Sequence, residues 1–136
     1  MTNEELIRGA LKARENAYCP YSCYAVGACV ECADGSVFEG CNIENASYGA
    51  TNCAERTAIY KAVSEGKREI SAIAIAGGKV GEEISGFAYP CGVCRQVINE
   101  FAKGDAKIIV AKSETDYKVL TLKDLLPEAF GPNNLE

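Results

Sequence analysis

Three cysteines stand where their sulfurs could act together. Cys53 lies in the segment 52–55, and Cys91 and Cys94 lie in the segment 90–94. Each segment opens a helical pattern, and a helix start presents free N–H groups and the positive end of the helix dipole. Both features favour thiolate over thiol. Three thiolates around a zinc ion would leave the fourth tetrahedral position open, which is typical of a catalytic zinc site.

Glu55 follows Cys53 by two residues and can bring a carboxylate beside that open position without binding the metal. Zinc lowers the pKa of its bound water to about 7, so a nearby carboxylate can take up the proton and deliver it to a substrate. Arg56 and Arg95 adjoin Glu55 and Cys94. Hydrogen bonds from these two arginines to the sulfurs would draw charge from a site whose thiolates outweigh the zinc charge.

Other interpretations of the same residues stay open. Asn52 and Glu55 have the spacing of a helix capping box, in which Glu55 would have no chemical role. Cys91 and Cys94 form a Cys-x-x-Cys dithiol, which is also found in thiol–disulfide oxidoreductases. A zinc-stabilised interaction module is a third alternative, although it needs a fourth ligand that no nearby residue clearly offers.

The elements that must position these residues follow from the hydrophobic pattern, which predicts the order α-β-β-α-β-α-β-β-α. Helices are expected over residues 2–17, 52–65, 90–103 and 121–126, and strands over 24–31, 36–41, 70–76, 107–112 and 117–121. A hairpin followed by β-α-β units predicts one α/β unit, with helices on the faces of a mixed sheet. The polar segment 42–52 between regular elements is where functional residues tend to lie.

Composition limits the remaining classes of function. The chain has 136 residues, eight cysteines and no histidine, which excludes Ser-His-Asp triads, Cys-His nucleophiles and HExxH zinc sites. A formal net charge of −5 argues against a nucleic acid polymer as partner. No apolar run approaches the roughly 20 residues of a membrane span, and the N-terminus has neither a signal core nor basic transit character. We therefore expect a cytoplasmic protein without membrane partners, whose cysteines are not four disulfides.

The five other cysteines are interpreted as small buried or half-buried fillers. They are Cys19, Cys23, Cys29, Cys32 and Cys41. Cys29 and Cys32 have the spacing of a zinc-binding pair. They lie in a predicted strand, however, where residues i and i+3 point to opposite faces, so we do not expect them to bind one metal ion together.

Cys53-x-Glu55 followed by Pro90-Cys91-x-x-Cys94 has the signature of zinc deaminases that act on nucleobases. The wider sequence resembles the cytidine deaminase family, in its small homotetrameric form with three cysteine ligands. The resemblance rests on blocks that keep their order along the chain, namely 21–22, 26–28, 40–48, 52–58, 90–96, and 125–127 with Phe130.

The resemblance implies one domain over residues 1–136, a three-layer α-β-α sandwich with a mixed five-stranded sheet. It implies hydrolytic deamination of cytidine and 2′-deoxycytidine to uridine and 2′-deoxyuridine, a step of pyrimidine salvage. Cys53, Cys91 and Cys94 would hold one Zn²⁺ per chain. Zinc-bound hydroxide would attack C4, while Glu55 would move protons to N3 and to the leaving amino group.

The resemblance also assigns the substrate contacts. Asn42 and Glu44 would bind the ribose 3′-hydroxyl, and a site built to bind a hydroxyl rejects analogues that lack it. The backbone of Ala54 would contact the base. Tyr48 and Phe130 would complete the sites of neighbouring subunits in a homotetramer.

Two aromatic residues depart from the family pattern. Tyr24 stands where the family usually has Phe, so its ring would still face the substrate but its hydroxyl needs a partner. Tyr89 stands where a small Ser or Thr is common, which changes the pocket wall. A blasticidin-type nucleoside deaminase shares the zinc motifs, but the segment 41–45 favours the cytidine branch.

Overall fold

Five strands form one mixed sheet in the computed structural model, which describes residues 1–135. The strands are β1 (Tyr24–Cys32), β2 (Val37–Cys41), β3 (Ile70–Lys79), β4 (Ala102–Ser113) and β5 (Asp116–Thr121). Their order in the sheet is β2-β1-β3-β4-β5. Strands β3 and β4 are parallel, and the other neighbouring pairs are antiparallel. The predicted mixed five-stranded sheet is confirmed.

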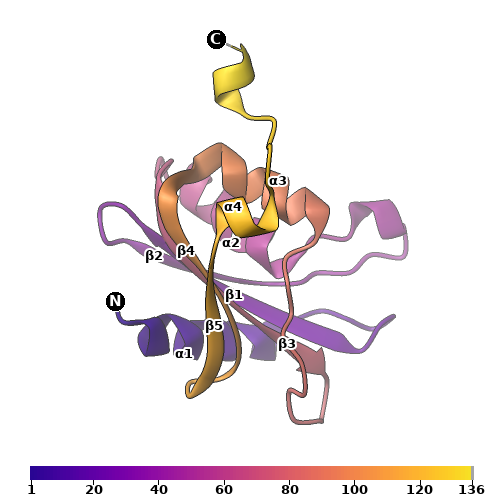
Figure 1. Cartoon of the computed structure of the whole chain (residues 1–136). Coiled ribbons are helices and arrows are strands. Elements are labelled where there is room, and N and C mark those ends of the chain that lie inside the picture. Colours follow the sequence, from indigo (N-terminus) through magenta and orange to yellow (C-terminus); the bar gives the residue numbers. More distant parts are fainter. Residues whose placement is uncertain (136) are drawn as a thin grey trace.

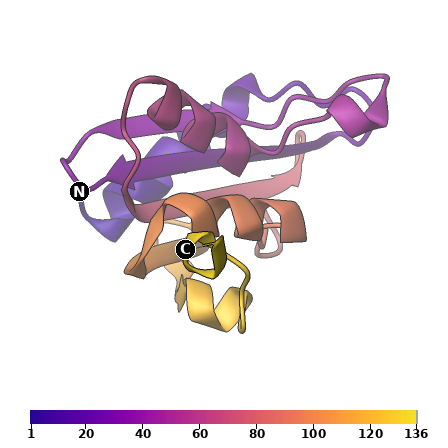
Figure 2. The same ribbon diagram turned by 90° about the horizontal axis from the view of Figure 1, so that it is seen from above.

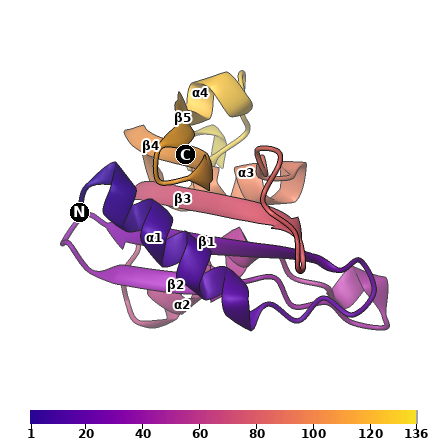
Figure 3. The ribbon, with the colours of Figure 1, turned by 90° about the horizontal axis from the view of Figure 1, so that it is seen from below.

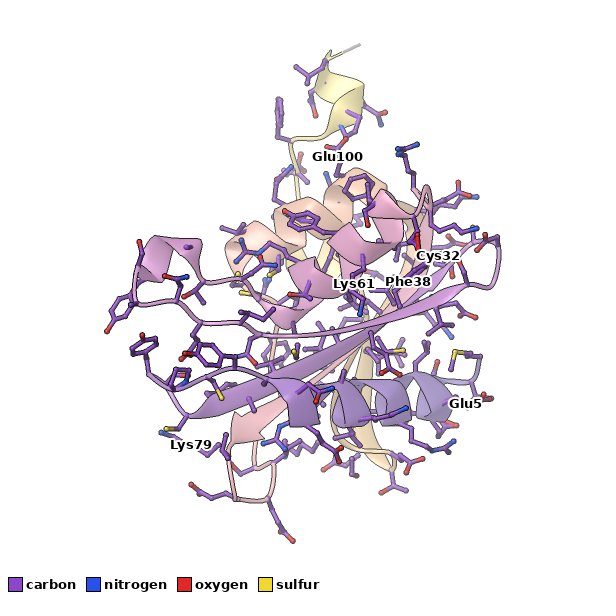
Figure 4. The ribbon with its side chains drawn as sticks, turned by 180° about the vertical axis from the view of Figure 1, so that it is seen from behind. Glu5, Cys32, Phe38, Lys61, Lys79 and Glu100 are labelled. Atoms are coloured by element: carbon purple, nitrogen blue, oxygen red, sulfur yellow. The ribbon has the colours of Figure 1, made fainter. Side chains whose placement is uncertain are left out.

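Helices cover both faces of this sheet (Figure 1). Helix α1 (Asn3–Ala13) lies on one face, and Figure 3 looks directly onto it. Helices α2 (Ala54–Ser64), α3 (Gly92–Phe101) and α4 (Leu122–Leu125) lie on the other face, which Figure 2 shows from above. In Figure 4, Glu5 on α1 and Lys61 on α2 lie on opposite sides of the sheet. The three-layer α-β-α sandwich is therefore confirmed.

Each face of the sheet has its own apolar core. Ile73 and Ile75 of β3 pack in the layer under α2 and α3, whereas Ala74 packs in the layer under α1. The alternation of side chains along a strand produces this division. It also places Cys29 in the α1 layer and Cys32 in the opposite layer, as expected for residues three apart in a strand.

Several element boundaries differ from the sequence prediction, among them the end of β3, which continues to Lys79 instead of residue 76. Helix α1 ends at Ala13 instead of near residue 17, and the 3₁₀ turn η1 (Arg14–Asn16) follows. The Arg14 side chain leaves the helix surface to donate hydrogen bonds to the carbonyls of Ala25 and Gly78. Strand β4 begins at Ala102, directly after α3, because Ala102 already pairs with Ile70 before the register shifts. Gly104 thus lies within the strand and does not end the helix.

Two further 3₁₀ turns lie outside the sandwich layers. They are η2 (Tyr48–Ala50), within the polar segment 42–52, and η3 (Pro132–Leu135), near the C-terminus. Among residues 1–135, no helix is both long enough and apolar enough to cross a membrane.

Candidate metal centre and active site

The starts of α2 and α3 bring three sulfurs together. Cys53 is the N-cap residue of α2, Cys91 is the N-cap residue of α3, and Cys94 lies in the first turn of α3. The Cys53 and Cys91 Sγ atoms are 3.9 Å apart, and those of Cys91 and Cys94 are 3.5 Å apart. All three Sγ atoms lie within 4.8 Å of one another. This arrangement can hold a metal ion.

The three sulfurs fit zinc in particular. Thiolate sulfur is a soft ligand that selects zinc over hard cations such as Mg²⁺ and Ca²⁺. Cys53 and Cys91 also line a cavity of about 440 Å³, which is large enough for a small-molecule ligand. Cys53, Cys91 and Cys94 would therefore hold zinc beside this cavity, where it would supply the water activation of catalytic zinc sites.

Glu55 lies in the same cavity, and its side chain is turned away from solvent. The residue is only 4% exposed, and it is the second residue of α2. Burial raises the pKa of the Glu55 carboxyl to about 7. A carboxyl with such a pKa exchanges a proton readily at neutral pH, as general acid–base chemistry requires.

The alternative capping role of Glu55 is wrong. A capping box would need Asn52 as the N-cap residue, but the helix begins one residue later with Cys53 in that place and without a side-chain cap. The Asn52 side chain instead donates a hydrogen bond to Thr57 Oγ1 at 3.2 Å.

Arg56 and Arg95 have different surroundings. Arg56 Nη2 donates to Cys53 Sγ at 3.2 Å. Hydrogen bonding with Cys94, together with the Arg56 guanidinium, lowers the pKa of the Cys53 thiol. Arg95 departs from the expectation that it donates to the sulfurs: its Nε donates to the Pro90 carbonyl at 2.7 Å, and its Nη1 to the Leu125 carbonyl at 2.8 Å. Arg95 therefore fixes the backbone beside Cys91.

The cavity is lined by residues from distant parts of the chain. Tyr24 and Asn42 lie beside Cys53, Ala54 and Glu55 in its lining. The Asn42 amide is held by β1, since Oδ1 accepts from Val26 N at 2.9 Å and Nδ2 donates to the Tyr24 carbonyl at 2.8 Å. These bonds fix the orientation of Asn42 at the cavity wall.

Glu44 lies in a neighbouring hollow, which shares Thr51 with the cavity. Its carboxylate accepts hydrogen bonds from the backbone N–H groups of Tyr21 and Ser22 at 2.9 and 3.1 Å, and from the Ser22 hydroxyl. The hydrogen bond from Ser22 is the main cause that lowers the pKa of Glu44. Glu44 therefore ties the turn at Tyr21 and Ser22 to the segment that follows β2.

Tyr48 and Phe130 lie apart from the cavity of their own chain within the described residues 1–135. Tyr48 is 75% exposed and makes an edge contact with Tyr21, whose ring centroid is 5.9 Å away. Phe130 is 59% exposed, and its carbonyl accepts from Gln96 Nε2 and Asn99 Nδ2. The structure thus presents both rings to the outside.

Sequence reasoning missed part of the cavity wall. Phe87 and Ala88 line the cavity with Tyr89, but the sequence analysis assigned neither residue to the site. The available signal was an aromatic residue on each side of Ala88, directly before the Pro90-Cys91 motif.

Comparisons with known proteins agree with this site. The family model described as "Cytidine and deoxycytidylate deaminase zinc-binding region" matches residues 1–112. A cytidine deaminase from Halalkalibacterium halodurans is 48% identical over 135 residues, covering 99% of this chain and 98% of the relative. One from Sporosarcina psychrophila is 45% identical over 135 residues, covering 99% and 96%.

Solved structures show the same likeness. The crystal structure of cytidine deaminase from Burkholderia pseudomallei superposes with a TM-score of 0.86 at 47% identity, covering 96% of this chain and 100% of that chain. The extent of these matches, with three thiols that converge beside Glu55, shows that the chain belongs to the cytidine deaminase family of zinc-dependent deaminases.

Proposed function

We propose that the chain converts cytidine and 2′-deoxycytidine, with water, into uridine or 2′-deoxyuridine and ammonia, and that it serves pyrimidine salvage. One observation carries this proposal: buried Glu55 shares a cavity with two of three convergent thiols. The names of the relatives described above agree with this substrate class. A dithiol oxidoreductase would use only Cys91 and Cys94, and it leaves the position of Cys53 and Glu55 unexplained.

Cys53, Cys91 and Cys94 would hold one Zn²⁺ per chain. When bound, zinc supplies a Lewis acid that lets water lose a proton near neutral pH. Arg56 donates to Cys53 Sγ and would reduce the negative charge of the three thiolates. Arg95 would keep the Pro90–Cys91 backbone in place through its bond to the Pro90 carbonyl.

Glu55 would carry the protons of the reaction. Its carboxylate would accept a proton from the water that attacks C4 of the cytosine ring, and would pass that proton to N3. It would then assist proton transfer to the 4-amino group, which leaves as ammonia. Burial in the cavity wall supports this role, because it places the pKa of Glu55 at about 7, where both protonation states are accessible.

The cavity wall would bind the rest of the nucleoside. The backbone of Ala54 would contact the base, and the ring of Tyr24 would lie against the substrate. Asn42 and Glu44 would bind the ribose 3′-hydroxyl. Asn42 lines the cavity, and its Nδ2 carries a second N–H beyond the one donated to the Tyr24 carbonyl.

Neighbouring subunits would complete each site. We propose a cytoplasmic homotetramer in which each chain, one domain over residues 1–136, lends Tyr48 and Phe130 to other subunits. The exposure of both rings supports this arrangement, because it leaves them accessible to a neighbouring subunit.

A matched pair of variants tests the function. Purified protein with one equivalent of zinc should deaminate cytidine, measured by the loss of cytidine absorbance and by ammonia release. Glu55→Gln should lower kcat by at least about 100-fold while zinc content stays the same. Glu65→Gln, at the exposed end of the same helix, should leave kcat unchanged. Full activity of Glu55→Gln, or no turnover by the unaltered protein, would refute the proposal.

A further inference from the structure

Lys118 of β5 reaches the cavity wall, although it lies on the outermost strand of the sheet. Its Nζ donates a hydrogen bond to Tyr89 Oη at 2.9 Å and lies 4.7 Å from the ring centroid of Phe87. Both rings belong to the segment that lines the active-site cavity. We propose that Lys118 is a positioning residue, which holds Phe87 and Tyr89 so that this wall is already formed when the substrate binds. The inference rests on the proposed function.

The direction of the Lys118 side chain follows from the sheet. Leu120, two residues further along β5, packs in the core under α2 and α3, so Lys118 lies on the same face. Lys112 of β4 continues the row of Ile108 and Val110, which also belong to that core. The two lysines therefore project beyond the apolar core, on the side of the sheet that carries the active site.

The two ammonium groups share one aromatic ring. Lys112 Nζ and Lys118 Nζ each lie 4.7 Å from the Phe87 ring centroid, within the range of a cation–π contact. The rings of Phe87 and Tyr89 are 6.3 Å apart and inclined at 55°. Of the two lysines, Lys118 also hydrogen-bonds Tyr89, so it joins both rings through one nitrogen atom.

The wall needs such a contact because it lies in an irregular segment between β3 and α3. Phe87 and Ala88 are only partly buried against the core, and Tyr89 is exposed. A loop with few buried contacts fluctuates more than the elements that it connects. Substrate that binds a mobile wall must also order it, and this ordering weakens binding.

The metal ligands are fixed separately from this wall. Pro90 is held by the bond from Arg95 Nε to its carbonyl, and Arg95 is itself held by the Leu125 carbonyl. Loosening Tyr89 should therefore leave Cys91 and Glu55 in place. Contacts that act equally on substrate and transition state change KM and leave kcat nearly constant. Loss of Lys118 should accordingly raise KM.

The test compares Lys118→Met with Lys12→Met, which removes an exposed lysine from α1 on the opposite face of the sheet. Lys118→Met should raise KM for cytidine about fivefold to tenfold and change kcat less than about twofold, as expected for the loss of one charged hydrogen bond. Lys118→Arg should restore most of the affinity. Tyr89→Phe should raise KM by a smaller factor, and adding it to Lys118→Met should have little further effect.

Hydrogen–deuterium exchange of residues 86–89 reports on the wall independently of turnover. Lys118→Met should speed exchange there at least about threefold, while Lys12→Met should not. The inference is overturned if KM and exchange in Lys118→Met equal those of Lys12→Met, or if kcat falls while KM is unchanged. Tyr89→Phe applies the same criteria if Lys118→Met does not fold. Failure of the unaltered protein to deaminate cytidine would refute the proposed function, whereas the exchange comparison would still decide whether Lys118 holds the wall.

Discussion

Arg56 Nη2 lies 3.2 Å from Cys53 Sγ and donates a hydrogen bond to it. This bond joins a guanidinium to a candidate zinc ligand at the start of the same helix, α2. Arg56 Nε is buried and has no hydrogen-bond partner among the described residues. A cationic side chain that directs a donor at sulfur stabilises the thiolate over the thiol, and Arg56 does so from a half-buried position. We therefore expect the guanidinium to reduce the negative charge of the three thiolates.

Arg56→Gln should weaken zinc binding, since the glutamine amide carries no charge to balance three thiolates. We expect the zinc dissociation constant, measured by competition with a chromophoric chelator, to rise about 10-fold to 100-fold. Arg68→Gln, which removes an exposed arginine from the connection between α2 and β3, is the matched control and should leave it unchanged. Equal zinc affinity in both variants would show that Arg56 has no influence on the metal.

The cysteines should differ sharply in reactivity. Cys23 is exposed, so the expectation of a buried or half-buried filler is wrong at this position, whereas Cys29 and Cys32 are buried as expected. With zinc bound, iodoacetamide at pH 8 should label Cys23 first, as followed by peptide mass spectrometry, and the buried pair should remain unlabelled. Removing zinc with a chelator should add exposed Cys91 and half-buried Cys53 to the labelled set.

Two controls accompany the labelling experiment. Cys23→Ser should abolish the first modification without altering the effect of zinc. In denaturant, all eight cysteines should react. Labelling of Cys29 in the folded protein as fast as Cys23, or a Cys91 rate that zinc does not change, would contradict the burial and the metal site described here.

The parts of the site that were predictable from the sequence are those whose positions depend on neighbouring residues in the chain. Cys53 and Cys91 each stand beside a helix start, and two helix starts next to one sheet can bring their side chains together. The partner of Arg95 was not predictable in this way. Arg56 and Arg95 both adjoin site residues, but the long arginine side chain selects its partner from the tertiary surroundings, which give Arg95 the carbonyls of Pro90 and Leu125.

The fold also has parts that short segments of sequence predict and parts that depend on distant contacts. Hydrophobic periodicity and turn residues predicted every strand of the sheet, because these signals lie within short segments. Boundaries set by distant contacts were misplaced. Ala102 joins a strand because Ile70 is its neighbour, and α1 ends early where Arg14 reaches β1 and β3. The wall contact of Lys118 belongs to this second class, since it joins residues 29 positions apart.

Gly27→Ala should be strongly destabilising, since Gly27 lies where α1 crosses β1. A Cβ atom at this position would lie 1.9 Å from the Ala10 carbonyl oxygen and 2.5 Å from Arg14 N, and both are backbone atoms that cannot turn aside. We expect urea unfolding to show a loss of more than about 2 kcal/mol. Gly104→Ala, in an exposed part of β4 with nothing within 4 Å, should change stability by less than about 0.5 kcal/mol. Similar losses in both variants would contradict the close packing of α1.

Ionisation of the Cys29 thiol should contribute to unfolding of the protein at alkaline pH. Burial is the main cause that raises the pKa of the Cys29 thiol from 9.0 to about 12, and the nearby carboxylates of Glu39 and Glu31 add to it. Between these two pH values the unfolded chain loses this proton while the folded chain keeps it, so the free energy of unfolding falls as pH rises. Cys29→Ala should remove this contribution. Between pH 9 and 12, the free energy of unfolding of this variant should fall less steeply than that of the unaltered protein, and the two slopes should differ by about 1.4 kcal/mol per pH unit. Urea titrations at several pH values from 9 to 12, with the exposed Cys23→Ala as control, measure the difference. Identical slopes for the two variants would show that the Cys29 thiol ionises in the folded protein as readily as in the unfolded chain.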